Sequence, residues 1–163
     1  MMNRFFFRHA LAAAAFALAG GIAFGQGLAT RKVLTLEGAK RIAAAAETEA
    51  RNNKWNVVIA ILDEGGHLLY LERMDGTQIG SLAVAQEKAA SAVKFKRPTK
   101  VFEDGVAGGR NAILKLPAAM PIEGGLPLTS DGAVVGAIGV SGVTSQQDGQ
   151  IAKAGVDALA KMK

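Results

Sequence analysis

The spacing of apolar residues predicts four helices in this chain. Between Thr35 and Asn53 they recur every three or four positions, which places them on one face of a helix that Thr35 caps. Similar spacing predicts helices over 81–96, 99–106 and 145–161, with a further turn over 110–116. Ser145 and Asp148 have the spacing of a capping box, which marks the start of the last helix.

Apolar runs between these helices predict strands that come in pairs. Residues 56–63 are apolar on both alternate faces, which is typical of a strand in the middle of a covered sheet. A Glu-Gly-Gly turn leads to a return strand over 67–74, and Asp131-Gly132 predicts a second hairpin before a strand over 133–140. Pro127 indicates that its strand lies near a sheet edge or is irregular. Hairpins imply a mainly antiparallel sheet, so the predicted fold class is α+β in layers.

The N-terminal segment has the pattern of a secretory signal peptide. Arg4 and Arg8 precede an apolar run over 10–24, which is shorter than the roughly 20 residues of a membrane-spanning helix. Small residues flank Phe24, which predicts cleavage after Gly25; the alternative is a retained N-terminal anchor. We expect a signal peptide over 1–25, a single domain over 26–163, no stable membrane span after cleavage, and a periplasmic or secreted location.

Charge and cysteine content narrow the class of partner. Cleavage would remove Arg4 and Arg8 but no acid, which lowers the net charge from +5 to +3, with 17 basic against 14 acidic residues. The lysines are spread along the chain, which does not favour nucleic acid as a partner. The chain has no cysteine, so an exported form has no disulfide and no thiolate metal site.

His67 is the only histidine after residue 25, and it follows the first predicted turn. Imidazole is a common ligand of haem iron, so His67 is either an iron ligand or a half-exposed histidine at a hairpin end. The two-residue period of a strand predicts one shared face for four residues: His67, Leu69, Leu71 and Arg73. Arg73 would bind a carboxylate or pair with Asp75. Met74 would contact a planar ligand, bind iron or join the core.

Lys88 falls inside the apolar arc of the helix predicted over 81–96. Its ammonium group either reaches solvent along the methylene stem or points inward at an anion. Glu123 could exchange a proton with Lys88 if the fold brings the two side chains together.

Two glycine-rich segments are further candidates for ligand binding. The first is Glu123-Gly124-Gly125, and the second, over 139–142, contains Ser141 and leads from a strand into the last helix. Backbone N–H groups in the second segment could bind a carboxylate, or its glycines could allow tight packing of the backbone. It has neither the P-loop sequence nor the dinucleotide-binding spacing.

Six short motifs follow one another along the chain: ILDEGGHL at 61–68, RMDG at 73–76, QEKA at 86–89, Phe95 with RPT at 97–99, EGGLP at 123–127 and GAIGVSG at 136–142. Taken together, these motifs resemble the GlcG/HbpS family, also known as DUF336. The similarity covers nearly all of the chain from about Leu34 to the last helix, and it is specific in the order of its motifs.

The resemblance implies a profilin-like fold with a five-stranded, mainly antiparallel sheet flanked by helices. Family members form compact oligomers, often octamers, and include secreted haem-binding proteins, the haem-binding domain of a cobalamin adenosyltransferase and proteins encoded with glycolate use. Haem is therefore the implied cofactor, with His67 as the candidate iron ligand. The other candidate binding residues are Arg73, Met74, Lys88, Glu123, Gly124, Gly125 and Ser141.

Three functions follow as hypotheses, and binding is favoured over catalysis. The first is an exported haem-binding protein for haem capture or redox sensing, in which Arg73 and Lys88 neutralise the propionates. The second is a cofactor-free isomerase or lyase of a small carboxylic acid, with Lys88 and Glu123 in acid–base roles and Arg73 binding the carboxylate. The third is a structural or partner-binding oligomer without a small ligand.

Overall fold

The computed structural model describes residues 27–162, and the signal peptide and cleavage site predicted over 1–25 lie outside them. The elements follow the predicted order along the chain. They are α1 (Leu36–Asn52), β1 (Val58–Asp63), β2 (Leu68–Arg73), α2 (Ser81–Phe95), α3 (Lys100–Ala107), the 3-10 helix η1 (Asn111–Lys115), β3 (Gly125–Ser130), β4 (Ala133–Ser141) and α4 (Ser145–Ala160). Within this part of the chain no helix combines the length and the apolar character needed to cross a membrane.

The sheet of residues 27–162 has four antiparallel strands in the order β2-β1-β4-β3. The α+β prediction is confirmed: β1 lies inside the sheet, as its two apolar faces predicted, and β3 with Pro127 lies at an edge. The prediction of five strands is wrong for this part of the chain. The segment before β3 contains Pro117 and Pro121, which lack the N–H group that a strand ladder requires, and it remains irregular.

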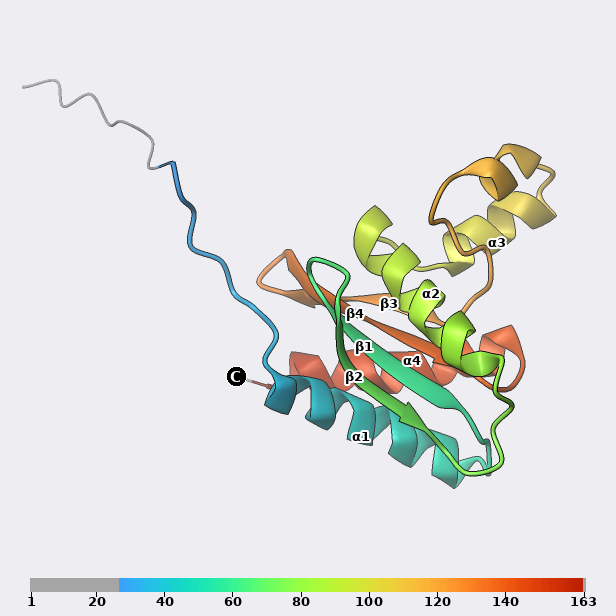
Figure 1. The fold of residues 1–163 in the computed structure, drawn as a ribbon, viewed down its shortest axis with the longest axis horizontal. Helices are drawn as coiled ribbons and strands as arrows, with labels where there is room; N and C mark the ends of the chain where they lie inside the picture. The colour runs from blue at the N-terminus through green and yellow to red at the C-terminus, as the bar shows by residue number, and fades with distance from the viewer. Residues whose placement is uncertain (1–26, 163) are drawn as a thin grey trace, which may run out of the picture. The chain divides into compact units, whose positions relative to one another are not determined.

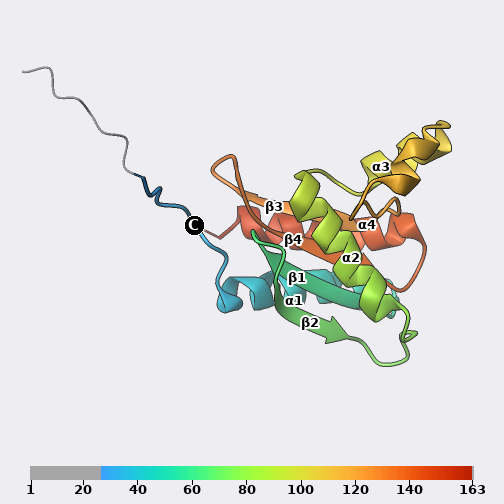
Figure 2. The same cartoon turned by 45° about the horizontal axis from the view of Figure 1, so that its top comes forward.

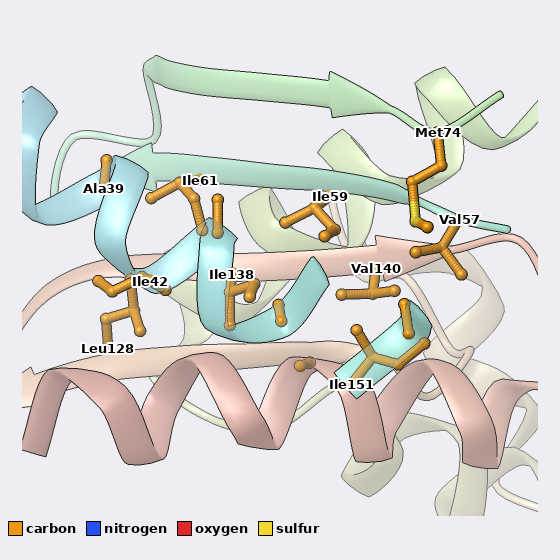
Figure 3. Packing of buried hydrophobic residues seen from close by; sticks show 14 of the residues in the cluster. Ala39, Ile42, Val57, Ile59, Ile61, Met74, Leu128, Ile138, Val140 and Ile151 are labelled. Atoms are coloured by element: carbon orange, nitrogen blue, oxygen red, sulfur yellow. The ribbon is translucent and has the colours of Figure 1, made fainter. Parts of the chain in front are cut away.

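Helices cover both faces of the sheet, and each face has its own apolar core. In Figures 1 and 2, α1 and α4 lie on one face and α2 lies on the other. The larger core lies between the sheet and α1 with α4 (Figure 3) and includes Ile42, Ile59, Ile138 and Ile151. The second core, under α2, is built largely from small side chains, among them Ala60, Ala85, Ala89, Ala92 and Ala137.

The small side chains under α2 let this helix cross β4 at backbone distance. A Cβ atom on Gly139 would lie 2.0 Å from the carbonyl oxygen of Ala85 and 2.6 Å from the amide nitrogen of Ala89. Both neighbours are backbone atoms, which have little freedom to move aside. Gly139 therefore sets how closely α2 approaches the sheet, and this is the tight packing that was one of the two interpretations of the 139–142 segment.

The structure corrects two local predictions, the start of the capping box and the common face of β2. The side chain of Thr144 caps α4 by accepting from the N–H of Gln147, and the Gln147 side chain accepts in return from the N–H of Thr144. The capping box therefore begins one residue before the predicted Ser145. A register shift between Ile61 and Leu62 interrupts the pairing of β1 with β2.

This register shift breaks the predicted common face of β2. Leu69 packs against the core under α1 and α4, whereas Leu71 packs against the core under α2. His67 lies outside the strand, in the connection that precedes Leu68. The expectation that His67, Leu69, Leu71 and Arg73 share one face is therefore wrong, because the irregular pairing adds a residue to β2 and changes the alternation.

Candidate functional site

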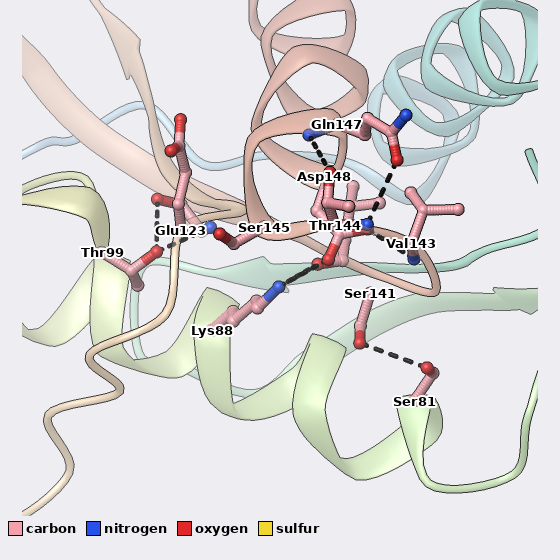
Figure 4. Close-up of polar contacts among 12 residues, drawn as sticks. Ser81, Lys88, Thr99, Glu123, Ser141, Val143, Thr144, Ser145, Gln147 and Asp148 are labelled. Atoms are coloured by element: carbon pink, nitrogen blue, oxygen red, sulfur yellow. Dashed lines mark hydrogen bonds and ion pairs between the residues drawn. The ribbon is translucent and has the colours of Figure 1, made fainter. Parts of the chain in front are cut away.

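A buried ion pair joins α2 to the start of α4 (Figure 4). The Lys88 side chain is 1% exposed and the Asp148 residue is 2% exposed. Lys88 Nζ lies 2.8 Å from Asp148 Oδ2 and donates to the carbonyl oxygen of Val140 at 3.0 Å. Of the two orientations left open for Lys88, the structure shows the inward one, and its anion is a carboxylate of the same chain.

The backbone after β4 also contributes to this carboxylate site. The N–H of Val143 donates to Asp148 Oδ1 at 3.3 Å, and the backbone of Gly142 makes a further hydrogen bond to Asp148. Burial raises the pKa of the Asp148 carboxyl group above its ordinary value, although Lys88 and these N–H groups act in the opposite direction. One of the two expectations for the segment over 139–142 was that its backbone binds a carboxylate. The carboxylate that the end of this segment contacts is the side chain of Asp148.

The segment before β3 closes over the ion pair. A Cβ atom on Gly124 would lie 2.8 Å from Lys88 Nζ and 2.7 Å from the carbonyl oxygen of Val140, so only glycine fits at this distance. Gly124 also has a φ of 125°, which disfavours any other residue. Gly125 is held by Thr99, whose hydroxyl oxygen accepts from the Gly125 N–H at 2.9 Å.

Glu123 lies beside this pair but is not its partner. Its Oε1 atom would lie 2.5 Å from a Cβ on Gly149, and its Oε2 atom is buried without a hydrogen-bond partner among the described residues. The ammonium group of Lys100 lies 4.0 Å from Oε2. Glu103 accepts hydrogen bonds from the Glu123 N–H and from the Ser145 hydroxyl. The structure therefore places Glu123 next to α4 and α3 rather than in an ion pair with Lys88.

Ser141 lies on the α2 face of the sheet, where its hydroxyl donates to Ser81 Oγ at 3.2 Å. With the Lys88–Asp148 pair, this contact fixes α2 across the end of β4 (Figure 4). The geometry suits a structural role, because the charges of Lys88 and Asp148 are already matched and the glycines leave no space beside Nζ.

His67 belongs to a different part of the molecule, the turn between β1 and β2. Asp63 Oδ1 accepts from the N–H groups of Gly65 and His67, each at 2.8 Å, and lies 3.4 Å from His67 Nδ1. Burial raises the pKa of Asp63, but these backbone hydrogen bonds and the imidazole outweigh it, so the pKa lies below its ordinary value. A Cβ on Gly65 would lie 2.8 Å from Nδ1, so glycine here allows the ring to lie against the turn.

The imidazole ring is available to a ligand from outside. The His67 side chain is 82% exposed, and the neighbouring Leu68 is 48% exposed. The turn also lies against the last turn of α2: a Cβ on Gly66 would be 3.7 Å from Cε of Lys94. An exposed imidazole, an apolar side chain and an ammonium group therefore lie close together.

Arg73 and Met74 lie at the other end of β2 from His67. Six residues of extended strand separate these ends, which corresponds to about 20 Å. Met74 is 7% exposed and belongs to the core under α1 and α4, which matches the core interpretation. The structure thus brings Lys88, Glu123, Gly124, Gly125 and Ser141 into one region, and it places His67 at a different end of the sheet from Arg73.

Sequence reasoning missed two carboxylates that define these regions. Asp148 was assigned only to a helix cap, because nothing in a sequence relates it to a lysine 60 residues away. Asp63 had a usable signal: it precedes a Gly-Gly turn by two residues, a position from which an aspartate often accepts turn N–H groups.

Comparison with known proteins connects these features to a family. The family described as "Haem degrading protein HbpS-like" matches residues 34–157. Protein GlcG of Escherichia coli is 44% identical over 112 residues, which are 69% of this chain and 84% of GlcG.

Two solved structures share the fold. A double mutant of Streptomyces reticuli HbpS is 34% identical, with a TM-score of 0.74 over 91% of this chain and 99% of that one. A structure described as the PduOC:heme complex is 28% identical, with a TM-score of 0.70 over 78% of this chain and 95% of that one. The order of motifs, the layered α+β fold and these matches agree, and the chain belongs to the HbpS-like (DUF336) family.

Proposed function

We propose that this protein binds haem at the turn between β1 and β2, with His67 as an iron ligand. Family membership and the similarity to the PduOC:heme complex support haem as the ligand class. The observation that carries the proposal is the pairing of an 82% exposed imidazole with a buttressing carboxylate. In our proposal the protein acts after export, as an oligomer, in haem capture or redox sensing.

The residues of the turn fit an iron-bound imidazole. Histidines that bind metals usually present their second ring nitrogen to a carboxylate or carbonyl, which fixes the ring and raises its basicity. Asp63 Oδ1 is 3.4 Å from Nδ1, so Nε2 is the nitrogen directed to an outside ligand. Two backbone hydrogen bonds hold the Asp63 carboxylate in this position.

The surroundings of His67 also suit a large amphipathic ligand. Leu68 provides exposed apolar surface, and the ammonium group of Lys94 provides a positive charge for a propionate. A bound haem would supply redox chemistry at its iron. The roles of this chain are to ligate through His67, to orient the ring through Asp63 and to balance charge through Lys94.

A haemin titration followed by the Soret band tests this proposal. We expect saturable binding with a red-shifted band in the natural protein and loss of that shift in His67→Ala. Asp63→Asn keeps the accepting oxygen for the turn but loses the charge, and should weaken binding about 10- to 100-fold. Arg73→Gln, an exposed cation at the opposite end of β2, is the matched control and should bind normally.

Other outcomes would refute the site or the function. Saturable binding that His67→Ala retains and Arg73→Gln loses would place the ligand at the other end of β2. The absence of saturable binding in the natural protein would refute haem as the ligand, and the isomerase or lyase hypothesis would then take its place. Analytical ultracentrifugation of the same samples tests the proposed oligomer.

A further inference from the structure

Between the end of α2, α3 and η1 lies an apolar cleft that the haem proposal does not use. Its volume is about 220 Å³, which is below the roughly 300–1,000 Å³ of sites for drug-sized ligands. The volume of the cleft equals that of roughly seven water molecules in the liquid. The lining residues are Phe95, Arg97, Val101, Phe102, Gly105, Arg110, Ile113 and Leu116.

The base and rim of the cleft differ in character. Phe102 and Ile113 are 5% and 7% exposed and form buried apolar surface, whereas Val101 and Leu116 are 48% and 41% exposed. The rings of Phe95 and Phe102 meet edge to face with centroids 5.1 Å apart, which makes this wall rigid. A small apolar group would find a preformed surface here.

Among residues 27–162, the only charged residues that line the cleft are Arg97 and Arg110. The Arg97 guanidinium carbon lies 5.9 Å from the centroid of the Phe102 ring, and its Nε donates to the Phe95 carbonyl oxygen at 3.2 Å. This contact orients the group and leaves its terminal nitrogens to bind a ligand. Within residues 27–162, neither Arg97 nor Arg110 has a carboxylate within 4.0 Å.

The acids of α3 are engaged elsewhere. Asp104 pairs with Lys100 at 2.7 Å, and Glu103 accepts from the Glu123 N–H and the Ser145 hydroxyl. The positive charge at the cleft is therefore not neutralised from α3. We propose that this cleft is a second binding site, for a small carboxylate with an aliphatic or aromatic body. The apolar base would take the body, and Arg97 with Arg110 would take the carboxylate.

Titration with hexanoate and benzoate, followed by NMR of the Ile113 and Val101 methyl groups, tests this site. We expect saturable shifts at these methyl groups for at least one acid. Arg97→Gln and Arg110→Gln should each weaken binding about tenfold or more. Each substitution removes charged hydrogen-bond donors, whose bonds to a carboxylate are stronger than those between neutral groups. Hexanamide and benzamide, which keep the apolar body but lack the negative charge, should bind more weakly than the acids by a similar factor. Lys115→Gln removes a cation of η1 that does not line the cleft, and should bind as the natural protein does.

Three results would overturn the proposal. The first is the absence of saturable shifts with either acid. The second is equal weakening by Lys115→Gln and Arg110→Gln, which would indicate general attraction of anions. The third is a concentration-dependent shift without any acid that Leu116→Ser abolishes, which would show that a second copy of the chain covers the cleft. None of these results depends on haem binding, because His67 does not line the cleft.

Discussion

Replacement of Lys88 by methionine should destabilise the protein strongly at neutral pH. The substitution keeps most of the side-chain volume but leaves the Asp148 carboxylate buried without its cation. Removal of one partner of a buried pair costs about 3–5 kcal/mol. For a domain of this size, that loss lowers the melting temperature by roughly 10–17 °C.

The deficit should shrink in acid. Burial already raises the pKa of Asp148, and loss of the Lys88 charge raises it further. A carboxyl group with a raised pKa in the folded state stabilises the fold most below its ordinary pKa, and this stabilisation is lost as the pH rises through the raised value. The difference in unfolding free energy between Lys88→Met and the natural protein should therefore decrease as the pH falls from 7 through the raised pKa of Asp148.

Urea unfolding at several pH values measures this effect. Lys153→Met is the matched control, because Lys153 pairs with Asp157 on the exposed face of α4 and such pairs contribute about 0–1 kcal/mol. Lys88→Met with Asp148→Leu removes both charges and should recover much of the lost stability. A loss in Lys88→Met no larger than in Lys153→Met would refute the reasoning, as would a deficit that is constant with pH.

Two further substitutions test the packing and the capping described above. Gly139→Ala places a methyl group against backbone atoms of α2 and should cost about 3 kcal/mol or more in unfolding free energy, whereas Gly80→Ala, with open space around it, should stay within about 0.5 kcal/mol; comparable losses in both would contradict the close approach of α2. Thr144→Ala removes the cap of α4 and should cost about 1 kcal/mol, whereas Ser145→Ala leaves the cap in place and loses only the contact of its hydroxyl with Glu103. Thermal unfolding followed by circular dichroism measures both pairs, and the absence of a measurable loss of stability in Thr144→Ala would contradict its role as the cap.

Local patterns in the sequence were sufficient for the elements and much of their arrangement. The apolar side chains on both faces of β1 indicated an inner strand, and the structure places β1 there. Pro127 indicated an edge or an irregular strand, because it has no N–H for a second neighbour, and the structure shows the edge position. The alternation of β2 failed as a guide because one irregular pair with β1 changes which side chains share a face.

The candidate sites could be predicted from the sequence to different degrees. His67 and its turn are adjacent in the chain, so the sequence could single out the residue, and only the exposure and the Asp63 contact needed the structure. The arginine cleft escaped detection because its lining comes from three elements, and no local spacing indicates that Arg97 and Arg110 face one cavity.

The sequence by itself determined the family, the order of helices and strands, and the residues in which chemistry was to be sought. These features follow from periodicity, turn residues and motif order, which are local properties of the chain. Only the tertiary structure decided that Lys88 is paired with Asp148 and that Gly124 lies against this pair. The physical reason is that burial and charge pairing depend on contacts between residues far apart in the chain, whose geometry no local pattern specifies.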